Sequence, residues 1–468
     1  MRRVLRRMSF MVPLAMFGWP LVAVLLFATL QPRQAVLASM IGSWLFLPIA
    51  EYSIPGLPDY TKASAATLGV LAGTLIFESA RIFSFRPHWI DAPIILFCLW
   101  SATSSLATGM GLWDATSVIV QQTIFWGLPY FFGRIYFADL HTCREFAIAI
   151  VVGGLIYIPL CLIEIRLSPQ LHKWIYGYYQ HSFAQTIRFG GFRPTVFMQH
   201  GLAVAMWMIN ATLLAMWLRA TGSVRRLGGV PLELFVLVML LTCVLLKSTG
   251  ALALLLLGIV ALFVSRVQNR SWPLFLLIAI APVWMIGRTV DWFNGRFVSE
   301  LFMIVSAERA GSFSVRLDQE DEIIKTALQH PIFGGNSWGP GADQWWLLCF
   351  RNFGAVGLAA FSAVFLLPGL VLLYRSTFRK MALPDWAPVT GMIVIAALYM
   401  IDNLANGMPN PIFTMTAGAM GSVIAIRKDH RSDFNSAVTD IKPRKRRLRR
   451  ELWPPSIYPG EGLSTEKC

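Results

Sequence analysis

The sequence predicts an all-α, polytopic integral membrane protein. Of its 468 residues, 56% are apolar and only 14% are charged, whereas roughly 25% charge is typical of a soluble domain. The mean hydropathy is +0.58. A soluble protein so poor in charge could not cover its surface, so much of the apolar area is expected to face lipid. The six cysteines are scattered and form no CxxC pair, which excludes a disulfide scaffold and a zinc ribbon.

Thirteen apolar runs are candidates for membrane helices, since about 20 mainly apolar residues cross a bilayer. They lie near residues 11–30, 35–50, 66–80, 92–109, 115–133, 145–164, 201–218, 231–247, 251–265, 272–288, 345–374, 386–404 and 411–426. The run 35–50 is short and breaks at Leu47 and Pro48, so we expect it not to cross completely. About twelve transmembrane helices remain, with both chain ends on the same side.

The connections between these runs predict the orientation. Five short connections are basic, and alternation of the runs places them on one side: 81–86, 134–144, 219–226, 266–270 and 375–380. Lysine and arginine remain on the cytoplasmic side, so this side is predicted to be cytoplasmic. The long connections 165–200 and 289–344 then lie outside. Within the second, residues 315–329 have apolar residues at helical spacing and an acidic face opposite, which predicts a helix.

The formal net charge of +15 does not indicate a nucleic-acid partner. Residues 1–10 carry four arginines, and residues 427–450 carry ten basic against three acidic residues, so these ends hold +11 of the +15. A nucleic-acid patch is the rival interpretation of the run 442–450. Basic runs beside membrane spans are more typical of orientation signals and of contacts with anionic lipid. We therefore expect membrane lipids, and no nucleic acid, as partners of the ends.

Four local patterns carry the functional prediction. The first is RFGGFRPTVFMQHG at residues 188–201, at the outer start of a span, and the second is KSTGA at 247–251, a tight turn between two apolar runs. The third is Arg316-Leu-Asp followed by HPIFGG at 330–335, and the fourth is DQWWL at 343–347 leading to RNFGAVGL at 351–358.

In their order and placement these patterns resemble the O-antigen ligase and O-antigen polymerase superfamily of bacterial membrane proteins. That family has an arginine, a helix, an H-P-x-x-G-x-G stretch, an H-N-x-x-L pair and then G-x-x-G-L on a membrane helix. The residues here that fall in register are Arg316, His330, Pro331, Gly334, Gly335, Leu347, Gly354, Gly357 and Leu358. The family's S-R-G-A turn is echoed at 248–251, and its G-x-F-x-H-P-N stretch at 191–200. Its histidine-asparagine pair is replaced by Asp343 and Gln344.

The resemblance implies a GT-C-like bundle in the bacterial inner membrane with its active side in the periplasm. It also implies a glycosyltransferase of cell-envelope polysaccharide biosynthesis, of the ligase or the polymerase type. Such enzymes move a glycan from an undecaprenyl-diphosphate donor to the hydroxyl of a glycan, lipid or protein acceptor. No cofactor and no metal are expected, because the seven histidines show no ligand spacing such as HExxH.

The resulting organisation has seven segments. They are a basic cytoplasmic N-terminus (1–10), N-terminal membrane helices (11–164), a periplasmic loop (165–200), central membrane helices (201–288), a large periplasmic loop (289–344), C-terminal membrane helices (345–426) and a basic cytoplasmic tail (427–468).

The chemistry of such a reaction selects the candidate site residues. Arginine forks suit phosphate, so Arg188 and Arg193 are predicted to bind the donor diphosphate. Asp343, Arg316 and Arg351 are predicted to be catalytic. Arginines stabilise the charge that develops on the leaving diphosphate, and a carboxylate can accept the proton of the acceptor. Contacts with the acceptor or glycan are expected from Gln344, His200, His330 and Trp345. An aspartate has a reference pKa of about 3.9 and is a weak base unless it is buried.

Structural alternatives exist for several of these residues. Arg316 can pair with Asp318 or Glu320 on its own predicted helix, and Asp343 can be a helix N-cap. Arg351 lies within an apolar run, where an ionisable residue is a functional candidate. At the level of function, the alternatives are a transporter or flippase for lipid-linked glycan and a non-catalytic protein of polysaccharide assembly.

Overall fold

The computed structural model describes residues 9–109, 111–305, 307–335 and 342–439. Residues 1–8 of the predicted basic N-terminus (1–10) and residues 440–468 of the predicted tail (427–468) lie outside these described residues. The chain divides into two units, Met1–Ile426 and Arg427–Cys468. The second unit contains the last part of helix α20 (Pro411–Thr439), and everything that follows concerns the first unit.

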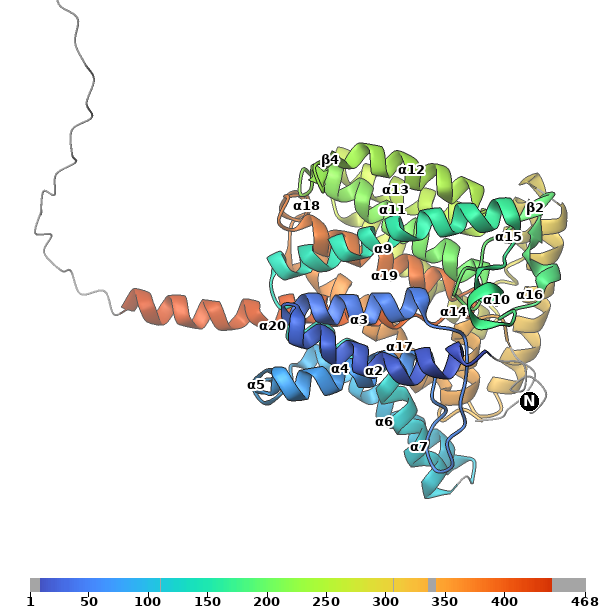
Figure 1. The fold of residues 1–468 in the computed structure, drawn as a ribbon, viewed down its shortest axis with the longest axis horizontal. Coiled ribbons are helices and arrows are strands. Elements are labelled where there is room, and N and C mark those ends of the chain that lie inside the picture. Colours follow the sequence, from blue (N-terminus) through green and yellow to red (C-terminus); the bar gives the residue numbers. More distant parts are fainter. Residues whose placement is uncertain (1–8, 110, 306, 336–341, 440–468) are drawn as a thin grey trace, which may run out of the picture. The chain divides into compact units, whose positions relative to one another are not determined.

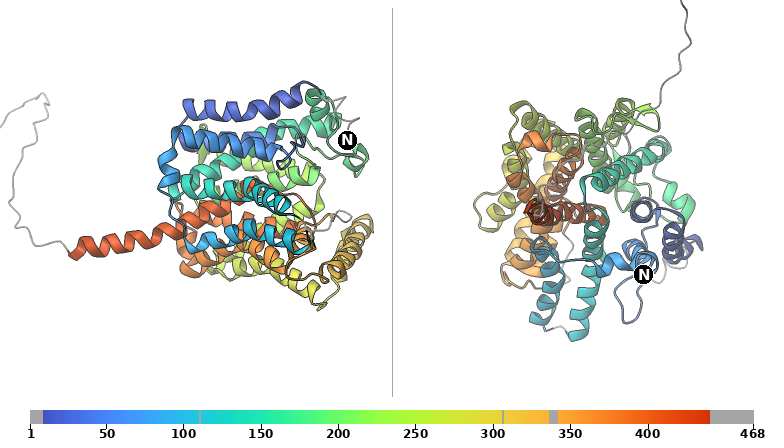
Figure 2. Two further views of the ribbon diagram at one scale, coloured as in Figure 1. Left: turned by 90° about the horizontal axis from the view of Figure 1, so that it is seen from below. Right: turned by 90° about the vertical axis from the view of Figure 1, so that its left-hand side faces the viewer.

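The first unit is built from helices that run back and forth between two ends (Figure 1, Figure 2). The N-terminal helices are α2 (Met11–Thr29), α3 (Pro32–Phe46), α4 (Lys62–Phe77), α5 (Ser79–Phe83), α6 (Ala92–Ala107), α7 (Leu112–Gln122), α8 (Leu128–Tyr136), α9 (Leu140–Leu167) and α10 (Leu171–Tyr176). The later helices are α11 (Gly201–Ala220), α12 (Leu232–Leu245), α13 (Thr249–Gln268), α14 (Trp272–Thr289), α15 (Arg296–Val305), α16 (Ala307–Ala327), α17 (Trp345–Arg375), α18 (Phe378–Met381) and α19 (Ala387–Asp402).

Strands are few among the described residues. A hairpin of β1 (Ile187–Arg188) and β2 (Gly191–Phe192) lies in the connection between α10 and α11. A second hairpin of β3 (Arg226–Leu227) and β4 (Val230–Pro231) joins α11 to α12. A π-helical turn, Thr123–Gly127, joins α7 to α8.

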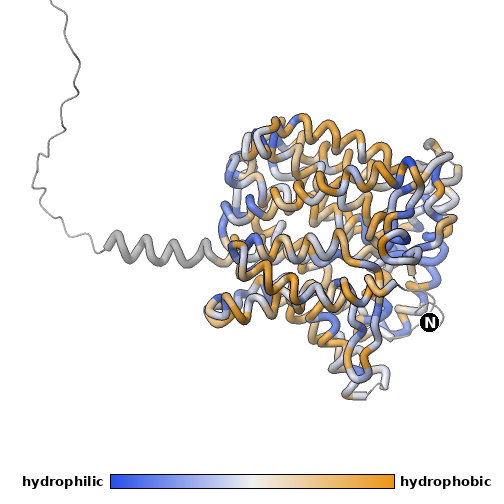
Figure 3. Tube along the Cα trace, viewed as in Figure 1, coloured by the Kyte–Doolittle hydropathy of each residue, from blue (hydrophilic) through white to orange (hydrophobic). Residues whose placement is uncertain are grey.

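The prediction of an all-α membrane protein is confirmed. Seven of the described helices are long and apolar enough to cross a bilayer: α2, α6 with the turn before it, α9, α11, α13, α14 and α17. Four shorter helices, α4, α12, α19 and the first part of α20, are also apolar. Figure 3 shows hydrophobic residues along the middle of the helices and hydrophilic residues gathered at their two ends. The count of twelve spans stays a prediction.

Two helices form the centre of the bundle. Nearly every side chain of α11 and α19 is buried, and these helices contact each other as well as α9 and α13. By contrast, α12 and α13 leave large apolar side chains such as Leu241 and Phe263 exposed. Since a bilayer replaces water around this surface, the exposed apolar side chains are lipid-facing positions and α11 and α19 are the core.

The five basic connections gather at one end of the bundle, as alternation predicted. The Arg144 guanidinium donates to the carbonyl of Ser223 (2.6 Å), and Arg266 donates to the carbonyl of Ala220 (2.6 Å). Figure 1 shows α5, α18 and β4 at this end, while α10, α15 and α16 lie at the opposite end. The long connections are therefore together at the second end.

Helix α3 has 15 residues and ends at Phe46, so the expected break at Leu47 and Pro48 is confirmed. It packs against α2 and α4 and also contacts α9. The backbone N–H of Ser9 donates to the carbonyl of Tyr176 (3.4 Å), so α2 begins at the end that holds the long connections. Twelve membrane helices with both chain ends on one side would require α2 to begin on the side of the basic connections. The structure places the start of α2 at the opposite end.

Candidate functional site

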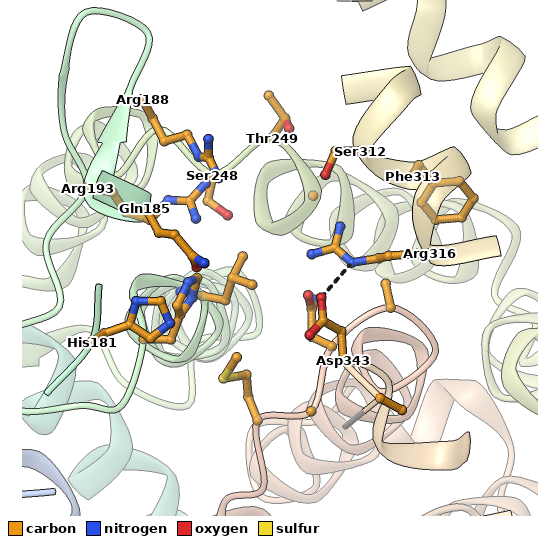
Figure 4. Close-up of a pocket in the computed structure, with 18 residues that line it drawn as sticks. His181, Gln185, Arg188, Arg193, Ser248, Thr249, Ser312, Phe313, Arg316 and Asp343 are labelled. Atoms are coloured by element: carbon orange, nitrogen blue, oxygen red, sulfur yellow. Dashed lines mark hydrogen bonds and ion pairs between the residues drawn. The ribbon is translucent and has the colours of Figure 1, made fainter. Parts of the chain in front are cut away.

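A pocket of about 300 Å³ opens at the end of the bundle that holds the long connections (Figure 4). Its lining comes from five stretches that are distant in sequence. The residues are His181, Gln185, Arg188, Arg193, His200, Leu202, Ser248, Thr249, Gly250, Ser312, Phe313, Arg316, Ala342, Asp343, Ala405, Asn406, Gly407 and Met408. The first, second and fourth sequence patterns and the arginine of the third thus meet in one place.

Three helices begin at this pocket. His200 is the N-cap of α11, and its Nδ1 accepts the N–H of Leu202 (3.0 Å). Ser248 precedes the first residue of α13, and Asp343 lies just before the N-cap of α17. The first N–H groups of a helix have no partner within it and carry partial positive charge, so helix N-termini favour anions.

Three arginines add full positive charge to the same pocket. Arg193 is 4% exposed, and its aliphatic part lies against Gly201, where a Cβ would overlap its Cδ. Arg188 lies on the β1–β2 hairpin, which Lys247 holds by donating to the carbonyl of Phe189 (3.1 Å). Arg316 enters from α16 (Figure 4). Among the described side chains that line the pocket, only Asp343 is a carboxylate.

Arg316 and Asp343 face each other across the pocket. The Nε of Arg316 lies 3.9 Å from an Oδ of Asp343, whose side chain is 66% exposed. The buried amide of Gln344 donates to the carbonyl of Arg316 (2.9 Å), which fixes this turn of α16 to the start of α17. Asp343 is not an N-cap, since Gln344 occupies that position without a capping hydrogen bond.

The alternative partners of Arg316 are engaged elsewhere or exposed. Glu320 is 1% exposed and accepts hydrogen bonds from Arg288 (2.8 Å) and Trp284 (3.2 Å) of α14. Arg288 also pairs with Asp321 (2.5 Å). Burial raises the pKa of Glu320 to about 7 although Arg288 opposes the shift. These contacts attach α16, and with it Arg316, to the bundle.

The HPIFGG pattern supports the pocket from outside its lining. The N–H of Ala355 donates to the carbonyl of Pro331 (2.7 Å), and that of Gly335 donates to the carbonyl of Arg351 (2.8 Å). Gly354 breaks the helical geometry of α17 at φ 65°, and a Cβ there would overlap the carbonyl of Ile332. Only glycine combines this conformation with such a close approach.

Glu164 is a functional candidate that the sequence analysis missed. It is 0% exposed within α9 and accepts three backbone N–H groups, from Leu171 (3.0 Å), Thr195 (2.8 Å) and Val196 (2.7 Å). Val196 has φ +48°, a strained value for a β-branched residue. Glu164 therefore holds the turn between Arg193 and His200. The available signal was a lone carboxylate within an apolar run.

His181 is a second missed residue. Its ring meets that of His200 edge-on, with centroids 4.5 Å apart. Burial lowers the pKa of His200 to about 3, and His181, Arg193, Arg188 and Arg316 add to this shift by charge repulsion. His200 is consequently neutral at physiological pH.

The pocket brings together five of the nine predicted site residues: Arg188, Arg193, His200, Arg316 and Asp343. The other four lie outside its lining. Gln344 is buried behind it, and the ring of Trp345 packs against those of Trp126 (5.7 Å) and Phe361 (6.3 Å). His330 is exposed just beyond the end of α16, and Arg351 is buried at the kink of α17.

Fold and site together define a polytopic helical membrane protein with a pocket lined by three arginines at one end of its bundle. Residues 234–345 match the family model described as O-antigen ligase. This match confirms the resemblance to the O-antigen ligase and polymerase superfamily over the part of the chain from α12 to the start of α17. It includes the turn at Ser248, Arg316 and Asp343, whereas Arg188 and Arg193 lie before it. No curated protein matches the chain significantly.

Within the described ranges of the chain, no three histidine, cysteine, aspartate or glutamate side chains lie close enough to hold a metal ion.

Proposed function

We propose that the protein transfers a glycan from an undecaprenyl-diphosphate donor to an acceptor hydroxyl in cell-envelope polysaccharide biosynthesis. The observation that carries the proposal is the convergence of Arg188, Arg193 and Arg316 with three helix N-termini on one pocket. A diphosphate is the anion that matches this excess of positive charge, and it lies at the membrane surface when it is attached to a polyprenol.

The arginines serve both binding and catalysis in this scheme. Arg188 and Arg193, from the hairpin and the turn after it, hold the diphosphate by forked hydrogen bonds. Arg316, aligned by Asp343, meets the oxygen whose charge grows as the sugar–phosphate bond breaks. Preorganised cations at such a position stabilise the transition state more than the ground state. Arg351 supports this arrangement from the kink of α17, and His330 begins the segment that contacts this kink.

The acceptor enters from the exposed side of the pocket. Asp343 and Ser312 line that side, and the acceptor is a hydroxyl of a glycan, lipid or protein. In the orientation that the basic connections predict, this side faces the periplasm of the inner membrane. The ligase and polymerase reactions share this chemistry and differ in the acceptor.

The decisive experiment reconstitutes the purified protein in liposomes with lipid-linked oligosaccharide extracted from the source organism. We expect release of undecaprenyl diphosphate that depends on an added acceptor. A transporter would move the donor across the bilayer without cleaving it, and a non-catalytic assembly protein would do neither. Either result would overturn the proposal.

A further inference from the structure

A glycosyl transfer of the proposed kind requires a group that takes the proton of the acceptor hydroxyl. The pocket lining offers three side chains with an atom that can accept a proton: Asp343, His200 and His181. Proton transfer is most efficient when the base has a pKa near the working pH. The surroundings of the three groups distinguish between them.

Asp343 is engaged in a different contact. Its side chain is 66% exposed, and an Oδ lies 3.9 Å from the Nε of Arg316. The geometry therefore gives Asp343 a role in aligning the arginine.

His200 is excluded by its hydrogen bonds. Its Nδ1 accepts the N–H of Leu202 at 3.0 Å, so this nitrogen carries no proton and its lone pair is occupied. In a neutral imidazole the proton then lies on Nε2, which makes that nitrogen a donor. His200 therefore has no nitrogen left that can accept a proton from a substrate.

His181 has the opposite tautomer. Its Nδ1 lies 3.3 Å from the carbonyl oxygen of Ser182, and because a carbonyl only accepts, Nδ1 carries the proton. Nε2 is then the basic nitrogen. The edge-on ring of His200, 4.5 Å away, limits the orientations of the His181 ring. Figure 4 shows His181 at the pocket wall opposite Asp343 and Arg316.

We propose that His181 is the general base of the transfer reaction, an inference that rests on the proposed function. The acceptor oxygen forms a bond to the anomeric carbon as its proton passes to Nε2 of His181. The bond between that carbon and the diphosphate oxygen breaks, and its electron pair stays on the diphosphate beside the arginines. The proton is released to water after the products leave. No further reactant is needed.

His181 lies among the charged groups of the pocket. The titratable and charged groups that face it from the elements around the pocket are His200, Arg188, Arg193, Arg316 and Asp343. Three of these are the arginines that hold the diphosphate in the proposed scheme.

The test compares His181→Gln, His181→Ala and Asp343→Asn in the reconstituted full-length protein. The matched control is His141→Gln, because His141 is an exposed histidine at the start of α9 and lies outside the pocket. Turnover is measured as release of undecaprenyl diphosphate between pH 5 and 9. Binding of undecaprenyl diphosphate alone is measured on each variant, which shows that the pocket is folded.

We expect His181→Gln to lower kcat by about 10²-fold or more, the usual contribution of a general base, with unchanged binding of undecaprenyl diphosphate. The fall in rate at acid pH should disappear in this variant, and added imidazole should restore part of the activity of His181→Ala. Asp343→Asn should keep the fall in rate at acid pH, which is the acid limb of the pH–rate profile.

Two outcomes would overturn the inference and are distinguishable. Donor cleavage by the wild-type protein together with a normal rate and acid limb in His181→Gln refutes the base assignment alone. Absence of cleavage by the wild-type protein refutes the proposed function, and the assignment of His181 with it.

Discussion

At the scale of single residues, the pocket depends on a few polar groups placed among apolar helices. Arg193 and His200 are held near each other by a turn that Glu164 anchors through three N–H groups. Arg316 is aligned by Asp343 in front and by Gln344 behind. Because so few charges lie in the membrane part of the chain, removing one leaves little to compensate for it.

Arg316→Ala is expected to lower transfer by about 10²–10³-fold, the usual cost of removing one preorganised donor to a developing charge. Arg316→Lys should retain more activity, because it keeps the charge and loses the fork. The measurement is donor cleavage per folded protein, with Arg296→Ala as a control on the exposed surface of α15. Equal activity of Arg316→Ala and wild type would remove Arg316 from the site.

Glu164→Gln is expected to disorder the turn that carries Arg193. The amide has one acceptor oxygen instead of two and turns an NH₂ group toward backbone N–H donors, so about 1.5–3 kcal/mol of charged hydrogen bonding is lost. We expect at least tenfold slower transfer and faster proteolysis within residues 165–200. Glu145→Gln, on the same helix and partly exposed, should behave as wild type.

At the scale of elements, two junctions set the position of the pocket walls. The kink of α17 receives the HPIFGG segment through backbone hydrogen bonds. Helix α16 is attached to α14 by Arg288 and Glu320, both almost fully buried. These elements bring Arg316 to Asp343 although 27 positions separate the two in sequence.

Gly354→Ala tests the first junction. The new Cβ would overlap the carbonyl of Ile332, and the backbone would be held at φ 65°, which costs about 1–3 kcal/mol or more. The thermal midpoint should fall and the 330–335 segment should exchange its amide hydrogens faster. Gly18→Ala, where a Cβ meets nothing within 4 Å, should not lower the midpoint.

The second junction is expected to depend on pH. The pKa of Glu320 is about 7 in the folded protein, above its ordinary value of 4.5, so folding favours the protonated form. The contribution of protonated Glu320 to the free energy of unfolding is complete below about pH 4.5 and is lost as the pH rises through 7. The thermal midpoint of unfolding should therefore be roughly a few °C higher at pH 5 than at pH 8.

Glu320→Gln should remove that dependence, whereas Glu322→Gln, at an exposed position of α16, should keep it. Hydrogen exchange of α16 provides the local measurement. A midpoint that depends on pH identically in both variants would show that other groups are responsible.

At the scale of the whole molecule, the helices place the long connections at one end and the basic connections at the other. The start of α2 lies with the long connections through the contact between Ser9 and Tyr176. Helix α3 packs as a regular partner of α2 and α4. Thirteen crossings, with the start of α2 outside, are therefore expected instead of twelve.

Cysteine labelling tests this topology. The five described native cysteines are buried, so a Cys468→Ser background should react little with a membrane-impermeant maleimide. Phe10→Cys and Leu57→Cys should react in intact cells, and Phe83→Cys only after permeabilisation; these positions are 77%, 60% and 83% exposed. Protection of Phe10→Cys together with labelling of Leu57→Cys would restore the twelve-helix topology.

The sequence by itself determined the class of the protein and the places to look for its site. Low charge and long apolar runs require helices in lipid, because backbone groups in a bilayer must be satisfied internally. The basic connections identified one end of the bundle. Arg188, Arg193, His200, Arg316 and Asp343 were selected from local patterns, and they line one pocket.

The tertiary structure decided which groups meet. No local sequence pattern identifies Glu164 or His181 as a site residue. Glu164 accepts the backbone N–H of Thr195, and the ring of His181 meets that of His200. The placement of Trp345 and Arg351 outside the pocket likewise follows from the kink at Gly354 and the packing around it. Hydrophobic periodicity fixes which segments are helical, but the rotation and end contacts of each helix depend on packing between segments far apart in the chain.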